Sequence, residues 1–184
     1  MQLNVGVLGA VWIACLAAPA QAADTEVEVS KDGSVFTVIA VSRVAAPPDA
    51  AWAVLVDYEA YPDFVPNLSL SRITRREPLR VEQRGSFGVL FFRREVHTEL
   101  EIDERPRAGI HFRALSGDLR RLDTELAIEP AGEGAAIRYL SRIEPDFWVP
   151  PLITAPLLKS SIRRKLQAVA VEIERRAALQ DRLQ

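Results

Sequence analysis

The sequence predicts one α+β domain, in which a curved antiparallel sheet of about seven strands packs on a long C-terminal helix. Two observations predict this fold. Over most of residues 35–143, apolar side chains recur at every second position, which is typical of strands with one buried face. After residue 151 they recur at every third or fourth position, as in an amphipathic helix. No Gly/Ser-rich or Pro-rich linker divides the chain, so we expect a single core.

The segment after the first strand predicts short helices. Residues 35–44 form that strand, which ends at the Ala-Pro-Pro-Asp sequence of residues 46–49. Between Trp52 and Val56 the apolar residues share one helical face, which predicts a short helix. Pro62 and Pro66 then bracket a turn, because proline does not continue a helix. We expect Tyr61, Phe64 and Val65 to lie on an irregular, partly exposed loop.

The later strands alternate with turn-forming sequences. The clearest alternation places Val96, Thr98, Leu100 and Ile102 on one face, and an Ala-Gly-Glu-Gly turn covers residues 131–134. The predicted strands are residues 68–74, 79–87, 95–103, 109–115, 119–129 and 135–143. A long helix then begins near Pro151 or Pro156, since proline fits the first turn. Its apolar stripe consists of Leu158, Ile162, Leu166, Val169 and Ile173.

The run from Trp52 to Pro66 carries a family resemblance. It reads Trp-Ala-Val-Leu-Val-Asp-Tyr-Glu-Ala-Tyr-Pro-Asp-Phe-Val-Pro. This run resembles the START-like (SRPBCC) superfamily of helix-grip proteins, and within it the coenzyme-Q-binding and polyketide-cyclase-like (cyclase/dehydrase) branch. There a Val-Asp-x-x-x-Tyr-Pro-x-Phe-x-Pro run follows the first strand. The resemblance implies an apolar cavity between sheet and helix, but no single function, because such folds host carriers, cyclases and toxins.

The N-terminal residues predict export. Residues 5–16 are apolar, and Ala20-Gln21-Ala22 is a small-x-small cleavage site, so residues 1–22 are interpreted as a secretory signal peptide and residues 23–184 as the domain. We therefore expect a periplasmic or secreted protein. Residues 1–4 contain no Lys or Arg, which leaves an uncleaved anchor as an alternative, and Cys15 leaves a lipoprotein as another. Cleavage would remove the only cysteine, and with it any disulfide or thiolate chemistry.

Charge and motifs argue against several function classes. The net charge of −2, with both signs intermingled, disfavours a nucleic-acid partner. Two histidines without Cys, Asp or Glu at ligand spacing predict no metal site. The chain also has no Gly-x-Ser-x-Gly elbow, phosphate-binding glycine loop or dinucleotide fingerprint, so no cofactor is expected. We expect a monomer, although the sequence leaves the oligomeric state open.

Strand alternation also predicts the chemistry of the cavity. Its inward polar side chains are Gln83, Thr98, Thr124, Tyr139 and Ser141, with Arg94 near a strand end, while both histidines point outward. No carboxylate or imidazole is then available for acid–base catalysis, which favours a carrier over an enzyme. The alternative is that the inward polar groups are ordinary core residues. The candidate cavity residues are Phe64, Gln83, Phe112, Tyr139, Trp148, Leu158 and Ile162.

Asp57 is the one acid at a fixed position of the family motif. It would be the candidate catalytic base if the protein were an enzyme. The alternative is structural, because an Asp at the end of a short helix commonly hydrogen-bonds the following turn through its side chain. We favour this structural role.

An aromatic turn at residues 84–94 predicts either membrane contact or a lid. Aromatic rings flanked by guanidinium groups suit a membrane interface, where the rings enter the headgroup region and the cations meet phosphates. The alternative is that the same residues pack over the cavity. The residues concerned are Phe87, Leu90, Phe91, Phe92, Arg93 and Arg94.

Together these features predict a periplasmic binding or carrier protein for an apolar small molecule, such as a lipid, an isoprenoid or a quinone-like compound. One alternative is a cyclase, dehydrase or aromatase that acts on a poly-carbonyl substrate, as the resemblance implies. Another is a protein-binding module. A transient contact with a membrane surface is compatible with each of them.

Overall fold

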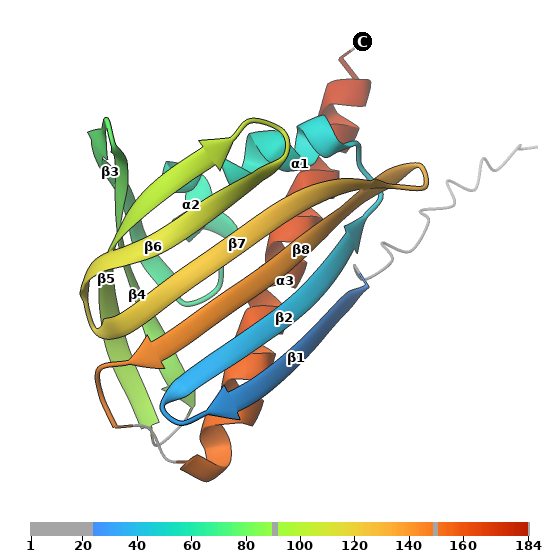
Figure 1. The fold of residues 1–184 in the computed structure, drawn as a ribbon. Coiled ribbons are helices and arrows are strands. Elements are labelled where there is room, and N and C mark those ends of the chain that lie inside the picture. Colours follow the sequence, from blue (N-terminus) through green and yellow to red (C-terminus); the bar gives the residue numbers. More distant parts are fainter. Residues whose placement is uncertain (1–23, 90–91, 149–150, 184) are drawn as a thin grey trace, which may run out of the picture.

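The structure, a computed structural model, confirms the predicted α+β fold (Figure 1). It describes residues 24–89, 92–148 and 151–183. In chain order the elements are β1 (Thr25–Asp32), β2 (Val35–Val44), α1 (Pro48–Leu55), η1 (Tyr58–Ala60), α2 (Tyr61–Phe64), β3 (Leu68–Arg76), β4 (Leu79–Val89), β5 (Phe92–Arg105), β6 (Gly109–Gly117), β7 (Leu119–Ala131), β8 (Gly134–Pro145) and α3 (Pro151–Asp181).

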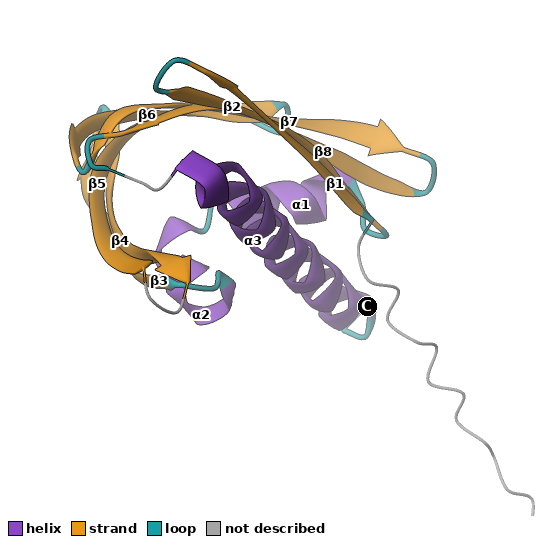
Figure 2. Cartoon of the chain, turned by 90° about the horizontal axis from the view of Figure 1, so that it is seen from below, coloured by secondary structure: helices purple, strands orange, loops and turns teal. Residues whose placement is uncertain are grey.

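In the described part of the chain the strands form one eight-stranded antiparallel sheet, in the order β1-β2-β8-β7-β6-β5-β4-β3. The first and last parts of the chain meet where β2 pairs with β8, from Phe36 opposite Ile143 to Val44 opposite Ala135. The sheet curves, and α3 lies along its concave side (Figure 2). This arrangement matches the helix-grip fold that the family resemblance implied.

The sheet has one strand more than predicted. The N-terminal β1, which the sequence analysis did not assign, forms a hairpin with β2, and Gly33 takes a φ of 57° in the turn. Only Val27 and Val29 give β1 an apolar face, and polar or charged residues surround them. Val27 is buried in a cluster that includes Leu158 and Ile162 of α3. Packing on α3 therefore supports a strand whose local pattern is weak.

Two proline-rich segments are more helical than predicted. The first helix, α1, begins at Pro48, where we expected a break before a helix that starts at Trp52. The expected turn between Pro62 and Pro66 contains the one-turn helix α2, with Pro62 in its first turn. Both differences have one cause, because proline is tolerated at the start of a helix, where its missing N–H has no partner to lose. Val65, expected on an exposed loop, is buried.

Apolar packing divides α3 into two halves. Its C-terminal half contributes Val169, Ala170 and Ile173 to a cluster that contains α1 residues. Its N-terminal half contributes Leu158, Ile162 and Leu166 to a second cluster with β1 and β2. None of the helices in the described ranges is long and apolar enough to span a bilayer.

Candidate ligand cavity

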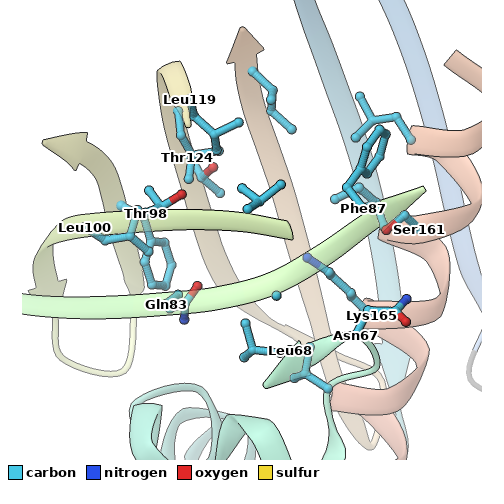
Figure 3. A pocket seen from close by; sticks show the side chains of 18 of the residues that line it. Asn67, Leu68, Gln83, Phe87, Thr98, Leu100, Leu119, Thr124, Ser161 and Lys165 are labelled. Atoms are coloured by element: carbon cyan, nitrogen blue, oxygen red, sulfur yellow. The ribbon is translucent and has the colours of Figure 1, made fainter. Parts of the chain in front are cut away.

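A cavity of about 290 Å³ lies between the concave face of the sheet and α3. Figure 3 shows side chains from several strands and from α3 that point into it. Most of its lining is apolar. The apolar lining residues are Phe36, Leu55, Val65, Leu68, Phe87, Val96, Leu100, Phe112, Leu119, Leu122, Leu126, Ile143, Pro145, Phe147, Leu158, Ile162, Leu166 and Val169.

Most of the candidate cavity residues from the sequence line this space. They are Gln83, Phe112, Tyr139, Leu158 and Ile162, which come from β4, β6, β8 and α3. Strand alternation brings the first three to the concave face, and helical periodicity brings the last two to the same space. These positions are therefore neighbours in space although they are far apart in the sequence.

Phe64 and Trp148 lie outside the cavity lining. The Phe64 ring packs edge-on against Tyr61, with the ring centroids 5.6 Å apart, and the Arg176 guanidinium lies 5.9 Å from its centroid. Trp148 is 73% exposed, whereas its neighbour Phe147 lines the cavity. Phe64 ends the one-turn helix α2, and Trp148 follows β8 outside any strand or helix. At both places the sequence has no periodic pattern from which the direction of a side chain could be predicted.

The inward polar side chains on the strands largely bond to one another. The Thr124 and Ser141 hydroxyls are 2.6 Å apart and buried, and the Gln83 amide donates to the Ser71 hydroxyl at 3.3 Å. Burial raises the pKa of Tyr139, and the hydroxyls of residues 141 and 124 oppose part of this shift. These groups are neutral, so they can orient a ligand but do not supply a charge.

Both histidines take part in contacts on the outer face of the sheet. His97 lies 3.2 Å from the Glu82 carboxylate, and His111 lies 3.3 Å from that of Asp123. Neither ring lines the cavity. No cluster of three or more His, Cys, Asp or Glu side chains suited to a metal ion occurs within the described ranges.

Sequence reasoning missed Lys165, which lines the cavity. Its side chain extends from α3 into the pocket (Figure 3). Among the lining residues that the structure describes, it alone is of a type that is ordinarily charged at neutral pH. Burial lowers the pKa of its ammonium group. The signal was present, since Lys165 falls three residues after Ile162 and four before Val169, within the apolar stripe.

Asp57 lies outside the cavity lining and joins two helical regions. Its carboxylate accepts a hydrogen bond from the Arg176 guanidinium of α3 at 2.7 Å. Its side chain makes no hydrogen bond to the turn that it precedes. The predicted hydrogen bond to the turn is therefore wrong, and the partner of Asp57 is Arg176. Arg176 also donates to Glu172, and both Arg175 and Arg176 lower the pKa of that carboxyl to about 2. Asp57 belongs to this ion network.

The aromatic segment is only partly described. Phe87 lines the cavity, and Arg93 is exposed and donates to the Ser86 hydroxyl at 3.2 Å. Arg94 is paired with Asp118 at 3.4 Å, and its guanidinium lies 4.6 Å from the centre of the Phe147 ring. Leu90 and Phe91 lie outside the described residues. Phe92 begins β5, but its side chain also falls outside the described part.

Known families and structures agree with the fold. Residues 44–170, more than half of the chain, match the family model described as polyketide cyclase / dehydrase and lipid transport. No curated protein sequence matches the chain. A solved START superfamily protein from Mycobacterium smegmatis is 18% identical, with a TM-score of 0.62, and the match covers 78% of this chain and 98% of that one.

Two further solved structures have different named activities. An aromatase/cyclase from Streptomyces sp. R1128 is 19% identical, with a TM-score of 0.60 and coverage of 77% of this chain and 95% of that one. A STAR-related lipid transfer protein from Xanthomonas axonopodis is 13% identical, with the same TM-score and coverage of 80% and 98%. At these identities the likeness establishes the fold alone.

Proposed function

Because this chain belongs to the polyketide cyclase / dehydrase and lipid transport family, we propose that it is a carrier that holds one apolar small molecule between its sheet and α3. The observation that carries the proposal is the apolar cavity of about 290 Å³. Ligand pockets typically measure about 300–1,000 Å³, so this one suits a small apolar molecule or one chain of a lipid. Each methylene that the ligand buries contributes about 0.8 kcal/mol to binding.

The lining supports a carrier more than a catalyst. No carboxylate or imidazole occurs among the described lining residues. Acid–base catalysis requires a group that exchanges a proton within hydrogen-bond reach of the substrate. Thr124 hydrogen-bonds to Ser141 and Gln83 to Ser71, and such neutral hydroxyl and amide groups are poor proton relays. Such a wall retains an apolar ligand without changing it.

One observation favours a second candidate, a cyclase or dehydrase. The Lys165 amine faces the cavity, and its lowered pKa increases the fraction of neutral amine. A neutral amine in an apolar pocket acts as a base or attacks a carbonyl group. This candidate predicts turnover of a poly-carbonyl substrate that is abolished in Lys165→Met, whereas the carrier returns its ligand chemically unchanged.

The proposed location is the periplasm, supported by the signal-peptide pattern of residues 1–22, which lie outside the described residues. N-terminal sequencing of protein from the periplasmic fraction tests this location, with Ala23 as the expected first residue. An intact Met1 in the membrane fraction would favour the anchor instead.

A membrane contact through the aromatic turn is part of the proposal. It is supported by the exposed Arg93, whereas Phe87 lines the cavity, as the lid alternative predicts. Replacing Phe91 and Phe92 by Ser should reduce binding to anionic liposomes, and raised salt should reduce it further, since the Debye length is only about 8 Å at physiological ionic strength. Ile39→Ser, at an exposed apolar residue of β2, is the control. Unchanged liposome binding in the double variant would contradict the membrane contact. Packing of the aromatic turn over the cavity would then be the remaining role.

Two neighbouring serines of α3 allow a matched test of the carrier function. Ser161 lines the cavity, whereas Ser160 is exposed. Ser161→Trp should fill the cavity and weaken binding of the neutral dye N-phenylnaphthylamine, measured by its fluorescence, by about tenfold or more. Ser160→Trp adds the same ring on the solvent side and should bind the dye as the unmodified protein does. Equal binding by both folded variants would show that the dye does not occupy this cavity.

A further inference from the structure

Lys165 leads to an inference about the chemistry of the ligand, which rests on the proposed carrier function. We propose that the ligand is an apolar molecule that ends in a carboxylate, and that Lys165 binds this carboxylate inside the cavity. The ligand class is then an amphiphilic acid of the fatty-acid type, and a neutral oil or alcohol would lack the group that the site recognises.

The Lys165 amine lacks a partner among the described residues. An ammonium group in an apolar site is destabilised unless an opposite charge or hydrogen-bond acceptors replace its water. The structure gives Lys165 no hydrogen-bond or ion-pair partner among the described residues, although it pairs most other half-buried or buried ions on the sheet and α3. A carboxylate brought by the ligand supplies the absent charge.

A second hydrogen-bond donor lies beside Lys165. Ser161 precedes Lys165 by four residues on α3, and both side chains line the cavity. Residues four apart lie side by side on one helix face. Of the two oxygens of a carboxylate, one can therefore accept from the ammonium and the other from the Ser161 hydroxyl. The hydrogen bond from the cation is the stronger of the two, because the charge of the donor strengthens it.

Charge balance favours a carboxylate over a phosphate. The other titratable side chains that line the cavity are the phenols of Tyr61 and Tyr139, and burial raises the pKa of both, so they remain neutral. Lys165 is then the sole charge among the described lining residues, and it balances one negative charge. A phosphate monoester carries more than one charge at neutral pH and would leave part of it unpaired in the cavity.

Competition against N-phenylnaphthylamine compares decanoic acid with decanol, which has the same chain but no charge. In Lys165→Met the affinity for decanoic acid, relative to that for decanol, should fall by about tenfold or more, as expected for a lost charged hydrogen bond. Binding of decanol should stay within about threefold. Lys159→Met, at an exposed lysine of α3, is the control and should change neither. Decyl phosphate should bind more weakly than decanoic acid.

The results separate this inference from the carrier function. If Lys165→Met keeps the acid-to-alcohol ratio of the unmodified protein while both ligands bind, the inference is wrong and the carrier stands. If decyl phosphate binds more tightly than decanoic acid, the carboxylate assignment is wrong. If neither the dye nor decanoic acid nor decanol binds, both the inference and the carrier are wrong.

Lysine titration by NMR gives a second measurement that needs no variant. The chain has three lysines, Lys31, Lys159 and Lys165, so isotope-labelled dimethyl groups on their amines give few signals. In the free protein the pKa of Lys165 should lie below the ordinary value for a lysine, and decanoic acid should raise it because a paired anion favours the charged amine. Decanol should not raise it. A pKa of Lys165 that ignores saturating decanoic acid would overturn the inference.

Discussion

The two halves of α3 differ in whether the protein provides a partner for a buried or partly buried charged side chain. In the C-terminal half the buried Glu172 carboxylate accepts hydrogen bonds from Arg175 and Arg176, and Arg176 continues to Asp57. In the N-terminal half the Lys165 amine faces the cavity, with no partner among the described side chains. One helix thus carries a satisfied ion network in its C-terminal half and an unpaired cation near its middle.

This contrast follows from the packing of the two ends. Near the C-terminal end, α1 packs on α3, and Tyr58 donates to Glu104 of β5 at 2.8 Å, which joins the helical segment to the sheet. Near the N-terminal end, α3 packs on β1 and β2, while the cavity lies between it and the more distant strands β4 to β7. A charge is stable in a closed region only when the protein supplies its partner, whereas an open cavity allows a ligand to supply it. The C-terminal half of α3 therefore stabilises the fold, and the N-terminal half borders the cavity in which a ligand can bind.

The largest expected effect compares two isoleucines of α3. Ile173, fully buried in the closed half, should lose about 2–5 kcal/mol of unfolding free energy on replacement by Ala. Ile162→Ala should lose less, because its side chain already borders the cavity and leaves fewer contacts behind. Urea denaturation of both variants measures the difference. A larger loss at Ile162 would contradict the division into a closed and an open half.

A pH titration should sharpen the role of the ion network. The pKa of Glu172 is about 2 in the folded protein and 4.5 ordinarily. Because the folded value is lowered, its contribution to stability is complete above pH 4.5 and is lost as pH falls toward 2. Glu172→Gln should therefore be less stable at neutral pH, by on the order of 2 kcal/mol, and the difference should vanish in acid. The pKa of Glu82 is also lowered to about 2, but Glu82 is present in both proteins, so its contribution cancels from the difference in stability between them.

Replacing the unpaired Lys165 should have the opposite effect on stability from replacing Glu172, a gain instead of a loss. Burial lowers the pKa of Lys165, so between that lowered value and 10.5 the unfolded chain binds more protons than the folded one, and stability rises with pH. Lys165→Met should be slightly more stable than the unmodified protein at neutral pH, by less than about 1 kcal/mol, and the gain should shrink as pH rises. Thermal unfolding at several pH values measures it. A marked loss of stability would mean that the amine has a partner in the folded protein.

The smallest effect is expected at Asp57. Its carboxylate is partly exposed and pairs with Arg176 outside the cavity lining, so Asp57→Asn should change the unfolding free energy by less than about 1 kcal/mol. Dye binding should stay within about threefold of the original. A loss of turnover of about a hundredfold on some substrate, with folding and binding intact, would instead identify a general base and favour the enzyme.

The sequence by itself determined the fold class and most of the cavity wall. Alternation with period two places Gln83, Phe112 and Tyr139 on the concave face, because successive side chains of a strand point to opposite sides. The helical period places Leu158 and Ile162 on the facing side in the same way. These are local rules, and the backbone geometry of one element is enough to apply them.

Only the tertiary structure decided the rest. The strand β1 exists because Val27 packs on α3, Asp57 pairs with Arg176 across 119 positions of sequence, and Trp148 faces solvent where Phe147 faces the cavity. Lys165 lies in the apolar stripe, yet whether its amine meets a carboxylate, solvent or an open space depends on which strands face that turn of α3. Such outcomes depend on contacts between segments far apart in the chain, which no local periodicity encodes.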